Sequence, residues 1–150
     1  MLAVSQLTDH TGFWLRMVSN AVSQEFARKV AGQGVTVAEW AFMRTLFHQD
    51  PMSPSALASL MGMTKGAISK LADRLLAKGL IIRTETPEDR RAHRLSLTAE
   101  GKAKVPVLAA LADDNDNAYF GTLAKEDHDM LRRILKALAE NRGLKVMPVD

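Results

Sequence analysis

Small, polar and basic residues recur at helical spacing in the middle of this chain. Gly66, Ser69, Lys70 and Asp73 fall on one face of a helix, with Lys65 and Arg74 on its flanks. Ammonium and guanidinium groups bind phosphates, and hydroxyl and ammonium groups can also hydrogen-bond the edges of bases. A glycine on the same face lets another surface come close to the backbone. The pattern is typical of a helix that lies against an anionic partner.

The helix that must position these residues has clear start and stop signals. Thr64 is a good N-cap residue and Gly79 follows the expected end, so we expect a helix over 64–78. Its opposite face is apolar, and a helix with this division packs that face on a core. The apolar residues are Ile68, Leu71, Ala72 and Leu75.

A shorter helix should precede it, because Ser53 followed by Pro54 marks a helix start. We expect it to run over 54–61 and to turn Leu57, Leu60 and Met61 inward. Gly62 and Met63 then form the turn, which gives a helix-turn-helix layout.

A two-stranded hairpin is expected after Gly79. Residues 80–84 and 94–97 read as its strands, and residues 86–93 read as a loop that begins at Pro87. Arg90, Arg91 and Arg94 lie in or beside this loop. A basic hairpin after a helix-turn-helix is the wing of a winged helix.

This region resembles the MarR family of bacterial transcription regulators. Asp89-x-Arg91, followed by Leu97-Thr98 and Gly101, is similar to the wing signature of that family, and residues 64–75 are similar to its recognition helix. The resemblance implies a homodimeric, mainly α-helical protein with a small β-wing. It also implies a DNA binder whose affinity a small ligand often modulates.

Roles for the basic residues follow from double-stranded DNA as partner. We expect Ser69 and Lys70 to reach base edges in the major groove, with Gly66 allowing close approach. Thr64, Lys65 and Arg74 should hold phosphates. Arg91 should probe the minor groove, with Arg90 and Arg94 beside it. Asp89 should orient these wing arginines, since phosphate would repel it.

We expect four further helices in the rest of the chain. The first covers residues 5–31, and the second begins at a Thr36–Glu39 capping box and ends at Asp50-Pro51. The other two cover residues 98–120 and 125–141. We expect one domain over 1–150, with the winged helix over about 36–98 and dimerisation helices over about 1–32 and 99–145. Apolar stripes on the terminal helices need a partner, and in the family that partner is a second copy. Residues 113–117 read as a solvated acidic face rather than a metal site.

Charge supports a nucleic-acid partner. The formal net charge is +3, and residues 51–100 account for all of it with eight Lys or Arg against five Asp or Glu. The alternative is a winged helix that binds another protein. No cysteine is present and the four histidines lie on separate elements, so we expect no enzyme, no cofactor and no metal. We see no signal peptide or membrane span and expect a cytoplasmic protein, most simply a repressor.

A small aromatic or anionic ligand is expected between the dimerisation helices and the winged helix, where the resemblance places such pockets. Candidate residues are Phe13, Trp14, Arg16, Met17 and Trp40. Arg16 could anchor a carboxylate bidentately while the aromatic residues meet a ring. The simpler expectation is that Arg16 reaches solvent or pairs with an acid of the protein, and that the aromatic residues pack in the core.

Overall fold

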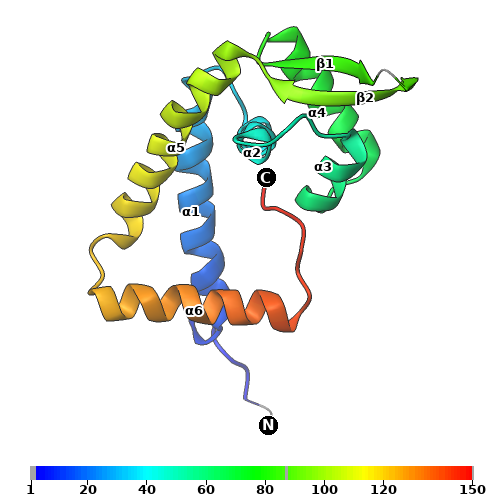
Figure 1. Ribbon diagram of the computed structural model, residues 1–150. Coiled ribbons are helices and arrows are strands. Elements are labelled where there is room, and N and C mark those ends of the chain that lie inside the picture. The colour runs from blue at the N-terminus through cyan, green and yellow to red at the C-terminus, as the bar shows by residue number, and fades with distance from the viewer. Residues whose placement is uncertain (1–2, 87, 150) are drawn as a thin grey trace.

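Six α-helices and a two-stranded wing make up the part of the chain that the computed structural model describes, residues 3–86 and 88–149, with the backbone alone for 89–91 (Figure 1). A short 3-10 turn, Leu7–Asp9, precedes the first helix. The helices are α1 (Thr11–Ala31), α2 (Val37–Leu46), α3 (Pro54–Met61), α4 (Lys65–Ala77), α5 (Ala99–Phe120) and α6 (Lys125–Asn141), and the strands are β1 (Ile81–Thr86) and β2 (Asp89–Leu97).

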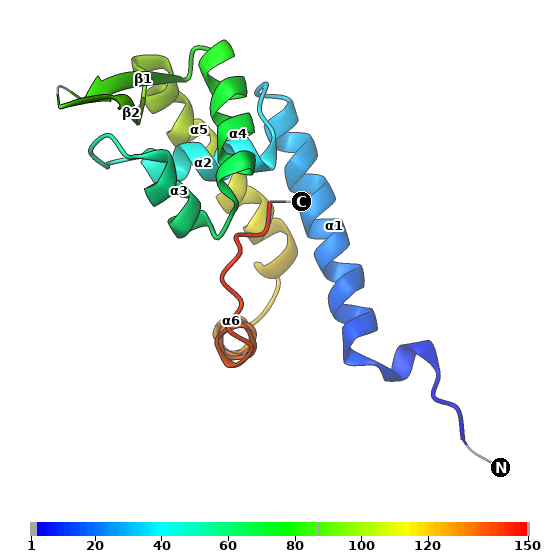
Figure 2. The same ribbon diagram turned by 90° about the vertical axis from the view of Figure 1, so that its right-hand side faces the viewer.

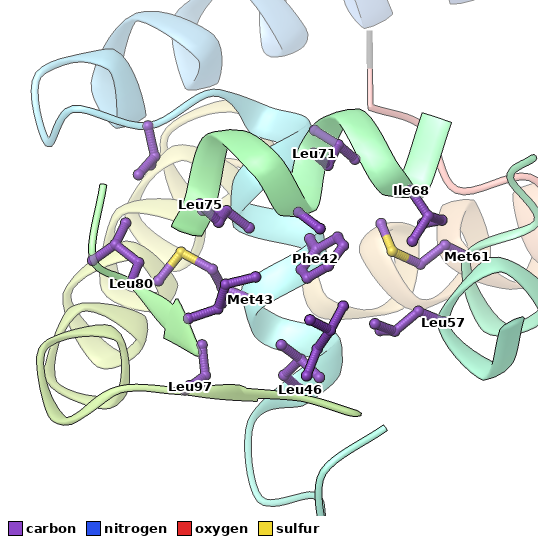
Figure 3. Close-up of a cluster of buried hydrophobic side chains, with 14 of the residues drawn as sticks. Phe42, Met43, Leu46, Leu57, Met61, Ile68, Leu71, Leu75, Leu80 and Leu97 are labelled. Atoms are coloured by element: carbon purple, nitrogen blue, oxygen red, sulfur yellow. The ribbon is translucent and has the colours of Figure 1, made fainter. Parts of the chain in front are cut away.

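The core lies where α2, α3 and α4 converge beneath the wing (Figure 3). All four apolar residues expected on the inner face of α4 are buried, and Leu57 and Met61 of α3 meet them. Leu60 was expected to turn inward as well, but its side chain is 56% exposed. That prediction was wrong because α3 spans only two turns and Leu57, Ala58 and Met61 already fill its inner face.

The wing is longer than expected. Strands over 80–84 and 94–97 were predicted, but β1 reaches Thr86 and β2 begins at Asp89, so most of the expected loop is paired strand. The strands are antiparallel, with Ile81 opposite Leu97 and a register shift after Glu85. Met52 adds a single bridge to Leu95 through hydrogen bonds of 2.9 and 2.8 Å, which ties the wing to the segment before α3.

Two helix ends also differ from the prediction. The first helix begins at Thr11 rather than residue 5, because His10 is extended and Asp9 accepts a hydrogen bond from the Gln6 amide. Helix α2 opens on the expected Thr36–Glu39 capping box but ends at Leu46, before the expected Asp50-Pro51. Phe47 follows it with an extended backbone (φ −67°, ψ 131°), and His48 after that takes a left-handed one (φ 63°).

The terminal helices form a limb that extends away from the winged helix (Figures 1 and 2). Helices α1 and α5 pack against each other, whereas α6 overlaps α1 only in the view of Figure 1 and stands apart from it in Figure 2. None of the residues of α6 is buried, although its bounds match the prediction. Its exposed apolar side chains are Met130, Ile134, Leu135 and Leu138. Among the helices of the described residues, none is long and apolar enough to span a membrane.

Candidate nucleic-acid interface

Helix α4 presents its polar face to solvent, as the sequence predicts. Thr64 caps it, with its hydroxyl oxygen accepting a hydrogen bond of 3.1 Å from the Ala67 amide. Because the opposite face is packed in the core, the orientation of the helix is fixed. The predicted DNA-contacting residues on and beside it are all exposed: Thr64, Lys65, Gly66, Ser69, Lys70 and Arg74.

The first turn of α4 offers hydrogen-bond donors as well as positive charge. The amides of Lys65 and Gly66 have no carbonyl partner within the helix, as in the first turn of any α-helix. The Thr64 hydroxyl serves as an acceptor toward Ala67, so its own proton remains free to donate. A Cβ added at Gly66 would meet no atom of the described residues within 4 Å, so no contact among them requires a glycine there.

The wing carries a further exposed basic residue. Arg94 is exposed and stands opposite Thr84 in the hairpin. Asp89, Arg90 and Arg91 belong to β2, but their side chains lie outside the described residues, so their roles stay predictions.

Two of the five cations between Thr64 and Arg83 are engaged within the chain. The Lys78 ammonium lies 2.9 and 2.8 Å from the two carboxylate oxygens of Glu39 and also donates to the Gly34 carbonyl at 2.8 Å. Arg83 of β1 lies 3.6 Å from Asp73 of α4, an exposed pair between wing and helix. The patch on α4 itself therefore consists of Lys65, Lys70 and Arg74.

Glu39 is fully buried, which sequence reasoning missed beyond its part in the capping box. Burial alone would raise the pKa of its carboxyl. Hydrogen bonds from Lys78 and Thr36, together with the charge of Lys78, outweigh burial and hold that pKa below the ordinary value of 4.5. The charged pair joins the start of α2 to the end of α4, so it helps to fix the angle of the exposed helix.

Thr98 and Gly101 act at the base of the wing rather than at its surface. The Thr98 hydroxyl donates to the Gly79 carbonyl at 2.8 Å and accepts from the Gly101 amide at 3.0 Å, so one side chain joins the end of the α4 turn to the start of α5. A Cβ at Gly101 would overlap the Leu80 carbonyl oxygen. The last part of the wing signature therefore positions the hairpin on α5.

The predicted ligand residues do not gather at one site in this chain. Trp40 lines a cavity of about 280 Å³ between α1, α2 and α5. Trp14, Arg16 and Met17 are exposed on the outer half of α1, with Phe13 half-buried beside Trp14, so their expected part in a ligand site stays a prediction. The cavity is lined by Val22, Ser23, Phe26, Val37, Trp40, Ala41, Ala112, Asn115, Asp116 and Pro148.

Asn115 departs from the solvated acidic face expected over 113–117, because it is only 3% exposed. Its amide nitrogen donates to the Val22 carbonyl at 3.2 Å, which fixes the orientation of the amide group. The oxygen Oδ1 has no partner among the described residues. Asn115 thus lines the cavity while its Oδ1 is buried and unpartnered among the described residues.

Comparison with known proteins agrees with this geometry. Residues 35–93 match the model of the MarR family. The repressor MdtR of Bacillus subtilis is 29% identical over 93% of this chain and 90% of its own. A structure of MepR from S. aureus in complex with DNA has a TM-score of 0.78 at 21% identity, covering 88% of this chain and 98% of that chain.

A structure of Bordetella bronchiseptica BpsR, whose DNA binding is regulated by 6-hydroxynicotinic acid, also has a TM-score of 0.78, at 20% identity over 91% of this chain and 98% of that chain. The two solved structures establish the winged-helix architecture with its helical limb. The family model covers the recognition helix and most of the wing, and the curated relative is similar along nearly the whole length. Residues 35–93 therefore match a MarR-family domain, and they lie within a chain that is similar to curated transcriptional regulators along nearly its whole length.

Proposed function

We propose that this chain is a homodimeric, sequence-specific regulator that represses transcription by occupying a pseudo-palindromic operator in double-stranded DNA. The exposed face of α4 is the observation that carries the proposal. Lys65, Ser69, Lys70 and Arg74 face solvent there, while the opposite face is anchored in the core. The resemblance to MdtR, a repressor, and to MepR, solved with DNA, supports the same function. The protein acts by binding, with no catalytic role.

The contacts divide between holding the DNA and reading it. Ser69 and Lys70 reach base edges in the major groove, and Gly66 lets the backbone approach. Thr64 and Lys65 bind a phosphate at the helix N-terminus, where free amides and the helix dipole add to the lysine charge. Arg74 holds a second phosphate, and the wing arginines reach the adjacent minor groove.

A second copy completes the limb. The apolar side chains of α6 are exposed in the single chain, as are Trp14, Leu15, Met17 and Val18 of α1. Burying both sets between two chains would remove them from water and place two recognition helices on one side of the dimer. The two half-sites should then be centred about 34 Å apart or a multiple of that distance.

The salt dependence of binding tests this function. If each subunit neutralises ~3–5 phosphates, log K against log salt should fall with a slope of about −5 to −9 for the dimer. Lys70→Ala should weaken operator binding. Lys125→Ala, which removes a cation from α6 far from the wing, is the matched control and should leave binding unchanged. A salt-insensitive complex, or a monomer that holds one half-site at full affinity, would rule the model out.

The alternative is a winged helix that binds a protein and has no operator specificity. The cations on α4 and the wing argue against it, because a protein partner would have to be strongly acidic to match them. Binding to random duplex DNA separates the two. A DNA regulator should bind random duplexes weakly and lose that binding as salt rises, whereas a protein-binding module should not bind them at all.

The cavity between α1, α2 and α5 is the proposed site for a small ligand that releases DNA. Trp40 and Phe26 offer aromatic walls, and a small turn of the Asn115 side chain would bring its buried, unpartnered Oδ1 to the cavity as an acceptor. Asp116 also lines the cavity, and no Lys or Arg is among the lining residues. An aromatic ligand with an N–H or O–H group therefore fits this cavity better than an anion does. A carboxylate ligand would need the exposed Arg16 and a different site.

A thermal-shift screen separates these two ligand chemistries. Neutral aromatic compounds that carry a donor should raise the melting temperature in a way that Asn115→Leu abolishes and Arg16→Ala does not. Aromatic carboxylates that act only when Arg16 is present would move the ligand site to the outer half of α1. A ligand that releases DNA must, by linkage, bind more weakly to the DNA complex by the same factor.

A further inference from the structure

The segment that follows α6 turns back and reaches the winged helix instead of trailing into solvent. Gly143 has a left-handed backbone (φ 63°), and the Leu144 amide donates to the Ala139 carbonyl at 2.9 Å, which closes α6. The chain then rises from the limb toward α2 and α3 (Figure 2, where it is drawn in red). It therefore makes a third link between the limb and the winged helix, besides those through α1 and α5.

The segment docks on the turn of the helix-turn-helix. The Met147 amide donates to the Met61 carbonyl at 3.1 Å, and the Met147 side chain packs against the core cluster. At Gly62, an added Cβ would lie 2.7 Å from the Lys145 carbonyl oxygen and 2.8 Å from the Val146 Cα. The nearest atoms to that position all belong to the C-terminal segment, so a glycine is required there for the segment to lie where it does.

This landing point is close to the DNA-binding face. Gly62 ends α3 with a left-handed backbone (φ 65°), and Thr64, the cap of α4, follows two residues later. Pro148, next to the docked Met147, is one wall of the cavity between α1, α2 and α5. One short segment thus contacts the turn that leads into the recognition helix and also closes the proposed ligand site.

We propose that residues 144–149 form a strap that ties α6 to the helix-turn-helix and so couples the arrangement of the dimerisation helices to the position of α4. This coupling rests on the proposed function, since its purpose is to keep two recognition helices at a fixed separation. With the strap docked, the winged helix cannot pivot freely on the ends of α1 and α5. A ligand that displaced Pro148 from the cavity wall would undock the strap and release that constraint.

Stability measurements test the docking without any DNA. Gly62→Ala introduces a side chain at positive φ and also expels the strap. Gly34→Ala introduces the same kind of backbone strain (φ 79°) where nothing lies within 4 Å, so it is the matched control. Both changes are made in the full chain and in a chain that ends at Gly143, which keeps every helix and strand, and urea unfolding is measured.

In the full chain, Gly62→Ala should shift the folding equilibrium toward the unfolded state about 5- to 100-fold more than Gly34→Ala does, which is the range expected for coupled contacts. In the shortened chain the two substitutions should cost the same within about threefold. If the excess cost of Gly62→Ala persists in the shortened chain, or is missing from the full chain, the strap is not docked and the inference is wrong. Met147→Ala in the full chain should likewise reduce the difference in stability cost between Gly62→Ala and Gly34→Ala.

DNA binding tests the coupling. An operator is first selected from random duplexes with the full chain. The shortened chain should bind this operator at least about 10-fold more weakly than the full chain does, because its two recognition helices are no longer held at a fixed separation before binding. Binding to random duplex DNA should change less than about threefold. Equal loss on both kinds of DNA, or no loss on the operator, would overturn the coupling. If neither chain binds DNA at all, the proposed function fails, while the stability cycle still reports on the docked strap.

Discussion

Replacing Lys78 by Met should destabilise the fold in a manner that depends on pH. The ammonium of Lys78 contacts both oxygens of Glu39, whose side chain is 0% exposed, whereas the side chain of Lys78 is 38% exposed. Removing one partner of a buried pair commonly costs about 3–5 kcal/mol, because the other charge stays buried without compensation. Since water can reach this site from the side of Lys78, we expect a smaller loss of about 2–4 kcal/mol at pH 7.

The sign of the pH dependence follows from the lowered pKa of Glu39. A carboxyl whose folded pKa lies below its unfolded value of 4.5 stabilises the fold above pH 4.5, and this contribution is lost as the pH falls through the folded pKa. Lys78→Met removes the hydrogen bond and the positive charge that lower the pKa of Glu39, so burial raises that pKa. The variant can then take up a proton as the pH drops, so its deficit relative to the natural chain should shrink between pH 7 and pH 4.

Urea unfolding at several pH values measures this deficit. The control is a double variant that combines Glu39→Gln with Lys78→Met, because the neutral amide keeps a hydrogen-bond acceptor for the Thr36 backbone without a buried charge. It should recover more than half of the stability that Lys78→Met loses. A deficit that is the same at pH 4 and pH 7, or a double variant no more stable than the single one, would refute the role assigned to this pair.

Three further predictions separate the DNA-binding surface from the scaffold. Gly66→Ala should stabilise the fold by about 0.5–1 kcal/mol, because alanine forms helix better than glycine and the position is open. The same change should weaken operator binding in a gel-shift assay. Unchanged affinity for the operator would contradict a close approach of DNA at Gly66. Gly101→Ala should cost about 3 kcal/mol or more in urea unfolding, since its Cβ overlaps a backbone oxygen, and a loss below about 1 kcal/mol would show that α5 can shift. Lys70→Ala should cost about 1–3 kcal/mol on the operator and relax preference at one or two base pairs, whereas Arg74→Ala should weaken operator and random DNA alike; the reverse pattern would exchange their roles.

Local signals predicted the elements that carry the interface. The bounds of α4 and α6 and the capping box at Thr36 follow from cap residues and apolar periodicity, which act within a few residues. The length of the wing strands was underestimated, because strand pairing continues beyond the apolar residues from which the strands were predicted. The length of helix α2 was overestimated because proline was taken as its terminator, while the extended backbone at Phe47 ends it earlier.

Contacts between distant segments could not be read from the sequence. Lys78 looked like part of the basic patch, and only its placement beside Glu39, 39 residues away, shows that it is engaged elsewhere. Asn115 sits among acidic residues and looked solvated, but α5 turns it onto the backbone of α1 at Val22. The docking of Met147 near Gly62 is equally remote in sequence. Each is a polar or backbone contact, which periodicity of apolar residues does not report.

Because the apolar face of α6 is exposed in the single chain, the proposed dimer forms to an extent that depends on the amount of protein in the cell. In the proposed dimer, a helix with none of its residues buried in its own chain would gain its tertiary support from the second copy. Below the dissociation constant of the dimer, the concentration of binding-competent dimer falls with the square of the total protein concentration. A twofold dilution, as when a cell doubles its volume without making more of the protein, would then lower the dimer about fourfold. Operator occupancy would respond to expression level more steeply than for a regulator that binds as a monomer, without any ligand being involved.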